Sequence, residues 1–141
     1  MSNWAPHLVG LATPLSAIIG FWLGGWWMLL PIVLLLGIYP LLDTLAGSTT
    51  IHDVEQEGTG HDIIVHLHGI LVPLVVLALL FRIWDGIGSI SIVVPILSAG
   101  LATGAAGVVA AHELGHRKPK SFSWWLGRLD LFSVLYLHFT V

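Results

Sequence analysis

Two histidines one helical turn apart are the residues of this sequence best suited to chemistry. They stand at the ends of the segment His112-Glu113-Leu114-Gly115-His116. On an α-helix, residues four apart share a face, and their Cβ atoms lie about 5–6 Å from one another. Two imidazoles at this spacing can bind one metal ion, and imidazole suits zinc, iron, copper and nickel alike. The spacing therefore predicts a metal site containing His112 and His116 without choosing the metal.

The same His-Glu-x-x-His motif occurs in zinc proteases, in which the two histidines bind the metal and the glutamate between them acts as general base. Membrane-embedded proteases of this kind add a third ligand, often an aspartate on a later span. Here Asp43 precedes the motif, and Asp130 lacks a glycine-rich setting. This order weakens the protease interpretation, which stays open, as does that of a non-catalytic membrane protein.

The composition indicates that these residues belong to an integral membrane protein. Of the 141 residues, 56% are hydrophobic and 9% are charged, whereas a soluble domain carries about 25% charged residues. The chain contains no cysteine, which excludes disulfides and thiolate chemistry. Its net charge of −3 gives no reason to expect nucleic acid as a partner.

Four stretches with few charges or none are long enough to cross a bilayer, whose core takes about 20 helical residues. Spans are predicted at Trp4–Leu23, Trp26–Leu42, Ile63–Phe81 and Gly86–Ala111, followed by part of a fifth or interfacial helix at Leu131–Val141. Gly24-Gly25, flanked by tryptophans, predicts a tight turn at a membrane surface. The spacing of Gly100 and Gly104 predicts close helix packing in the fourth span. Since backbone groups in lipid must be satisfied internally, we expect an all-α bundle that forms one transmembrane domain over residues 1–141.

The basic residues predict how the bundle is oriented. All of them except Arg82 follow the fourth span, and the positive-inside rule places that end in the cytoplasm. Arg82 lies at the opposite end of the third span and is expected to pair with Asp85. The N-terminus and the histidine pair are then expected on the cytoplasmic side of what is, in a bacterium, the inner membrane.

Three further histidines, His61, His66 and His68, could be considered as ligands of a second metal site. The geometry of a regular helix argues against this. His61 and His68 share a helix face but stand two turns apart, at about 10 Å, and His66 points almost the opposite way from His68. We expect these side chains to hydrogen-bond inside the bundle or to line a polar pocket. Asp43, at the end of the second span, is a candidate for supporting the metal site or for pairing with a helix end.

The segment from residue 112 to residue 141 resembles the first histidine box and following helix of the alkane 1-monooxygenases, within the membrane hydroxylase and desaturase group. In that family the box is followed by a basic residue, a tryptophan-bearing amphipathic stretch and a His-Phe segment that leads into a second box. The matching residues are Arg117, Trp124-Trp125, His138-Phe139 and, in the family's first hairpin, Ala12-Thr13-Pro14 and Pro40-Leu41-Leu42-Asp43. The similarity covers most of the chain.

The resemblance implies an enzyme in which two non-haem iron ions activate O2 and hydroxylate the terminal C–H bond of an alkane or similar apolar chain that arrives from the lipid. It implies electrons from a rubredoxin-type carrier and the NAD(P)H-dependent reductase of that carrier. A fatty-acid desaturase or an aromatic side-chain hydroxylase of the same group would share this box, and both alternatives stay open.

The resemblance also assigns roles to residues of this chain. His112 and His116 are the implied metal ligands, and the residues expected to orient or support them are Glu113, His68, His138 and Asp43. The family gathers its iron ligands from several boxes, and two histidines cannot complete a site for two iron ions. We therefore expect the chain to be truncated before the second histidine box and to be inactive by itself.

Overall fold

The computed structural model describes residues 5–46 and 59–136, and every regular element within them is helical. The elements are η1 (Ala5–Leu11), α1 (Ala12–Leu23), η2 (Gly25–Leu29), α2 (Leu30–Val33), η3 (Leu34–Ile38), α3 (Tyr39–Ala46), α4 (Thr59–Asp85), α5 (Val93–Gly115) and α6 (Phe122–Ser133). The first two η elements are 3₁₀-helical and η3 is π-helical. The predicted all-α membrane bundle is confirmed.

Three helical stretches in the described residues are long and apolar enough to cross a membrane, namely Gly25–Ala46, Thr59–Asp85 and Val93–Gly115. The first apolar helix, His7–Leu23, is shorter. The predicted start of the fourth span at Gly86 is wrong, because residues 86–92 form the turn before α5. In this turn Gly86 and Gly88 have φ angles of 105° and 67°, which glycine adopts without a Cβ clash. At its other end α5 continues into the histidine motif.

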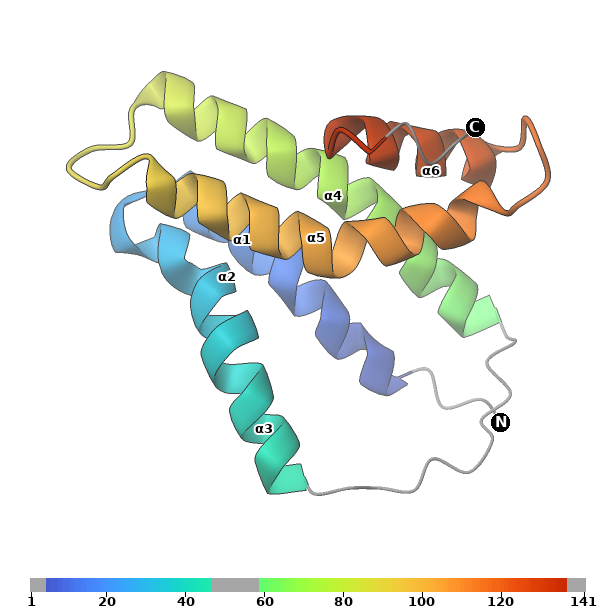
Figure 1. The fold of residues 1–141 in the computed structure, drawn as a ribbon, viewed down its shortest axis with the longest axis horizontal. Helices are drawn as coiled ribbons and strands as arrows, with labels where there is room; N and C mark the ends of the chain where they lie inside the picture. The colour runs from blue at the N-terminus through green and yellow to red at the C-terminus, as the bar shows by residue number, and fades with distance from the viewer. Residues whose placement is uncertain (1–4, 47–58, 137–141) are drawn as a thin grey trace.

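The long helices α4 and α5 lie side by side, with α1 and α6 packed against both (Figure 1). A buried apolar cluster joins α1, η2, α4 and α5 and consists of Ala17, Phe21, Met28, Val75, Ala99 and Ala102. By contrast, α3 leaves the bundle at an angle and packs mainly on η3, which precedes it (Figure 1). The tightly packed part of the fold is therefore the α1–α4–α5–α6 unit that carries the histidine motif.

The tight turn predicted at Gly24-Gly25 is present, with φ angles of 71° and 57°. Directly after it, η2 folds back onto α1, so that Gly20 lies against the carbonyl oxygen of Trp27 and any Cβ at that position would collide with it. Trp22, Trp26 and Trp27 are all exposed, as expected of tryptophans at a lipid–water boundary.

The close packing predicted at Gly100 and Gly104 is not found, because a Cβ at either position would meet open space in the described structure. Small residues do allow close approach further along the same flank of α5. There Gly107 faces Val72 of α4, and Ala111 faces Gly127 of α6. The difference arises because α6 covers this flank at Gly107 and Ala111, and no described residue covers it at the two earlier glycines.

Arg82 joins the two turns at the end of the bundle opposite the histidine motif. Its guanidinium donates from Nε to the Phe21 carbonyl at 2.7 Å and from Nη2 to the Trp22 carbonyl at 3.1 Å. Nη1 donates to the Gly86 carbonyl and pairs with Asp85 at 3.1 Å, so the predicted Arg82–Asp85 pair is confirmed. The arginine thus satisfies the carbonyls at the end of α1 while it holds the α4–α5 turn.

Replacing Arg82 by methionine is expected to destabilise the bundle by about 1.5–3 kcal/mol, the range for hydrogen bonds to a charged group. The Arg82 side chain is only 14% exposed, whereas that of Asp85 is 56% exposed. Asp85→Asn should therefore cost less than about 1 kcal/mol. Reversible unfolding in mixed micelles, followed by circular dichroism, measures both variants. Equal losses for the two would show that the carbonyl contacts contribute nothing beyond the ion pair.

Candidate metal centre

The two histidines of the motif stand on the last turn of α5. His112 belongs to the helix and His116 is its C-cap, whose backbone N–H bonds to the His112 carbonyl. The two Nε2 atoms lie 3.0 Å apart, and the rings meet edge to face with centroids 4.5 Å apart. Both side chains are exposed. The predicted pairing of the two imidazoles on one helix face is present in the structure.

This geometry allows both imidazoles to serve one ion. The Nε2 atoms are at hydrogen-bond distance, 3.0 Å, and two nitrogens that each bind one metal ion at about 2.1 Å stand a similar distance apart, about 3.0–3.4 Å. Within residues 5–46 and 59–136, no group of three or more His, Cys, Asp or Glu side chains is arranged to hold a metal. The described residues can therefore supply two imidazole ligands on one side of an ion, and no complete coordination shell.

The face of α5 opposite the histidines anchors the motif in the bundle. Leu114 is fully buried, and it packs against the helices on both sides. A Cβ on Gly69 of α4 would lie 2.7 Å from the Leu114 side chain, and one on Gly127 of α6 would lie 2.9 Å from its Cβ. The two glycines let α4 and α6 close on this leucine, so the motif turns its histidines outward and its leucine inward.

Glu113 takes part in an ion-pair bridge. Arg117, just after the motif, donates to Asp62 at the start of α4 at 2.6 Å and contacts Glu113 at 3.4 Å. The bridge ties the last turn of α5 to the first turn of α4. The predicted role of Glu113 in orienting a histidine is not tested by this arrangement, in which its oxygen contacts Arg117.

A second tie lies one turn further along α4. His66 Nδ1 lies 2.6 Å from the Asp62 carbonyl, and Nε2 lies 2.8 Å from the Ser123 hydroxyl of α6. Because a carbonyl can only accept, Nδ1 donates to it, and a neutral ring then accepts from Ser123 at Nε2. The ring of His66 also stacks on that of Phe122 at 6.3 Å. The prediction that His66 hydrogen-bonds within the bundle is confirmed.

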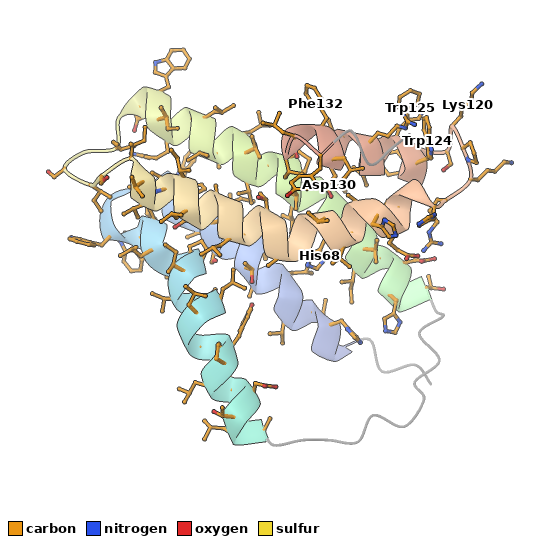
Figure 2. All side chains as sticks on the ribbon, viewed as in Figure 1. His68, Lys120, Trp124, Trp125, Asp130 and Phe132 are labelled. Carbon is orange, nitrogen blue, oxygen red and sulfur yellow. The ribbon has the colours of Figure 1, made fainter. Side chains whose placement is uncertain are left out.

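The other predicted support residues are not gathered around the pair. His68 donates to the Ile64 carbonyl at 3.0 Å, and its far edge packs over Gly10 of η1 (Figure 2). Asp43 is exposed on α3, the helix that leaves the bundle. His138 lies outside the described residues. His61 packs edge to face on His7 with centroids 4.9 Å apart, and no described partner satisfies its ring nitrogens.

Sequence reasoning missed the residues that fix the motif in place. Asp62 and His66 are four residues apart at the start of α4, and this spacing could have shown that they share a face. Their partners, Arg117 and Ser123, flank the connection between α5 and α6, and no sequence pattern pairs them with α4. The sequence offers Asp130 only as a possible protease ligand, whereas the structure buries it between α6 and α5.

Comparison with known proteins shows that this chain is similar in sequence to two alkane 1-monooxygenases. Alkane 1-monooxygenase 1 of Alcanivorax borkumensis is 30% identical over an alignment of 150 positions, gaps included, which covers 95% of this chain and 36% of that protein. Alkane 1-monooxygenase 2 of the same organism is 30% identical over 138 aligned residues, covering 91% of this chain and again 36% of the relative. The resemblance to the alkane 1-monooxygenases is confirmed. The chain spans about a third of the length of these curated relatives. The activity of the full-length enzymes is therefore only proposed for this chain.

No family model matches the chain, and no solved structure matches it. The similarity to the alkane 1-monooxygenases runs over nearly the whole chain and therefore includes α1, α4 and α5 together with the motif. The sequence similarity therefore extends over the helices of the bundle and is not confined to the histidine segment.

Breaking the Asp62–Arg117–Glu113 bridge is expected to loosen the last turn of α5, where helix ends fray most easily. Asp62→Ala should weaken the affinity of the histidine pair for Cu²⁺, used as a probe ion, by about two- to fivefold, the scale of a partly exposed ion pair. Titration followed by electron paramagnetic resonance measures this affinity.

Asp85→Ala is the matched control, since it removes an aspartate of similar exposure from the ion pair at the other end of α4. It should leave Cu²⁺ affinity unchanged. An unchanged affinity in Asp62→Ala, with helix content retained, would show that the bridge does not position the histidines.

Proposed function

We propose that this chain forms the part of a membrane di-iron monooxygenase that carries the first histidine pair, with alkanes or similar apolar chains as substrates. The supporting observation is that His112 and His116 present Nε2 atoms 3.0 Å apart at the end of a membrane-length helix. The second support is the similarity to two alkane 1-monooxygenases along this same stretch. A soluble or surface-bound enzyme would not place such a pair at the end of an apolar span.

In the proposed enzyme, His112 and His116 hold iron as neutral imidazoles through Nε2. Bound iron supplies the redox chemistry that splits O2, with one oxygen atom entering the substrate as a hydroxyl group and the other leaving as water. This reaction consumes two electrons and two protons for each alkane molecule that is hydroxylated. We propose that the remaining ligands come from the part of the relatives that this chain does not cover, since the described residues offer no third ligand beside the pair.

The setting suits a substrate that is dissolved in lipid. α5 is apolar over most of its length and is long enough to cross the bilayer, so in the proposed enzyme an alkane reaches the histidine end without entering water. We propose a rubredoxin-type carrier and its NAD(P)H-dependent reductase as the electron source, docking at the membrane face where the motif emerges. With the basic residues after α5 on the cytoplasmic side, that face would be the cytoplasmic face of a bacterial inner membrane.

A chimaera tests the proposal directly. This chain is joined to the part of Alkane 1-monooxygenase 1 of Alcanivorax borkumensis that lies beyond the aligned region, and conversion of an alkane to the terminal alcohol is followed by gas chromatography. The chimaera should hydroxylate the alkane, and His112→Ala or His116→Ala should lower the rate at least about 100-fold, as loss of a metal ligand does.

His7→Ala is the control, because His7 is an exposed histidine on η1 with no place in the proposed site. It should retain the rate of the parent chimaera. A chimaera that binds two irons and hydroxylates alkane equally well without His112 would contradict the proposal.

Measuring the metal content distinguishes the proposed monooxygenase from a zinc protease, which would contain the same His-Glu-x-x-His motif. The 141-residue chain alone is expected to bind less than one iron per chain and to show no hydroxylase activity, since it offers two imidazoles only. Glu113→Gln should retain metal binding and reduce hydroxylation in the chimaera by at most about tenfold, because its partner in the structure is Arg117. In a protease this substitution removes the general base and abolishes peptide cleavage. Stoichiometric zinc with peptidase activity lost in Glu113→Gln would reverse the assignment.

A further inference from the structure

α6 exposes large apolar side chains on its outer face and buries its one acidic residue, which is unusual for a helix in water. The residues that it buries against α4 and α5 are Leu126, Gly127, Asp130 and Leu131. The Asp130 side chain is fully buried, and neither of its carboxylate oxygens has a hydrogen-bond partner among the described residues. The opposite face exposes large apolar side chains, at 70% for Phe122, 58% for Trp125, 52% for Leu129 and 61% for Phe132.

These four side chains form one continuous stripe, since they follow one another at intervals of three or four residues. Figure 2 shows the two faces, with Asp130 between α6 and α5 and Phe132 pointing away from the bundle. A helix in water directs its charges outward and its aromatic residues inward. An apolar outer face, with the one acidic residue turned inward, suits a helix whose outer face meets hydrocarbon.

The direction of α6 relative to α5 indicates how deep the stripe reaches. Gly127 packs against Ala111 and Gly115, at the end of α5, and Asp130 further along α6 lies beside Gly107. On α5, Gly107 lies about 12 Å inward from Gly115, at 1.5 Å per residue. α6 therefore turns back along α5, a helix long enough to span a membrane, from the histidine end of α5 toward its middle.

Three of the last carbonyls of α6, at its inward end, accept backbone hydrogen bonds. Val134 N–H donates to the Asp130 carbonyl, Leu135 N–H to the Phe132 carbonyl, and Tyr136 N–H to the Leu131 carbonyl at 2.8 Å. Leu135 takes the left-handed conformation, with φ of 61°, that closes such a helix end. A helix end in contact with lipid must satisfy its carbonyls internally, and those of Asp130, Leu131 and Phe132 are satisfied in this way.

The entrance to α6 has the side chains of a membrane surface. Lys118 and Lys120 are exposed in the connection before the helix, and Trp124 and Trp125 stand on its first turn (Figure 2). Lysines pair with anionic lipid headgroups, and tryptophans favour the headgroup boundary. The lysines precede the stripe, which begins with Phe122 and Trp125 and continues with Leu129 and Phe132, and this order suits a passage from headgroup to acyl chain.

We propose that α6 is a re-entrant helix, which enters the leaflet at the histidine end of α5 and contacts lipid acyl chains through Phe122, Trp125, Leu129 and Phe132. This proposal is independent of the reaction, since it depends only on the packing of α6 along a membrane-spanning helix. It places the connection between α5 and α6 at the headgroup level, beside the histidine pair.

Depth-dependent fluorescence quenching tests the proposal, and the cysteine-free chain allows one probe at a time. Phe122→Cys and Phe132→Cys, from the two ends of the stripe, are labelled with an environment-sensitive fluorophore and reconstituted in phosphatidylcholine–phosphatidylglycerol vesicles. Quenchers are lipids with a nitroxide near the headgroup, lipids with a nitroxide near the chain end, and aqueous iodide. Val109→Cys, on an exposed position of α5 near Gly107, is the reference for depth.

The probe at Phe132 should match the reference at Val109, with stronger quenching by the deep nitroxide and several-fold weaker quenching by iodide than at Phe122. The two stripe positions should differ in depth on the order of 10 Å. Leu129→Cys, one turn shallower, gives a second comparison should the Phe132 variant fail to insert.

Three results would overturn the proposal. Equal depths at Phe122 and Phe132 would mean a helix lying flat in the interface. Strong iodide quenching at Phe132 would mean a helix in water. Protection of both positions from nitroxides and from iodide would mean that another protein segment covers the stripe.

Discussion

The close approach of α4, α5 and α6 around Leu114 is the contact on which the rest of the candidate site depends. Gly69 and Gly127 remove the side chains that would otherwise stand between these helices and the leucine. In a bilayer, apolar side chains gain little by leaving lipid for protein, so close van der Waals packing must hold such helices together. Because Leu114 lies inside the motif, the packing that joins the helices also fixes the direction of the histidines.

Polar contacts add a defined register to this packing at the membrane surface. Asp62 and His66 on α4 reach Arg117 and Ser123, one on each side of the connection between α5 and α6. At the opposite end of the bundle, Arg82 hydrogen-bonds to the end of α1 and to the turn between α4 and α5 and thereby holds them together. These directional bonds at the ends of the spans act together with the packing around Leu114 to select one arrangement.

The two sides of α5 serve different purposes near its end. One side is covered by α4 and α6 and contains small or apolar residues, among them Gly107, Ala111 and Leu114. The other side carries His112 and His116, which are exposed in the described structure. A similar division applies to α6, whose single acidic residue faces the protein while its aromatic stripe faces outward.

The sequence by itself determined the fold class, the turn at Gly24-Gly25, and the pairing of His112 with His116. These features follow from local rules, since charge-free stretches must be helical in lipid, glycine permits the turn, and residues four apart share a helix face. Only the tertiary structure decided that Gly107 and not Gly100 packs closely, that Asp62 meets Arg117, and that α6 folds back along α5. Such contacts join residues distant in the chain, and they depend on the rotation and offset of whole helices, which a hydrophobic pattern without strong periodicity leaves undetermined.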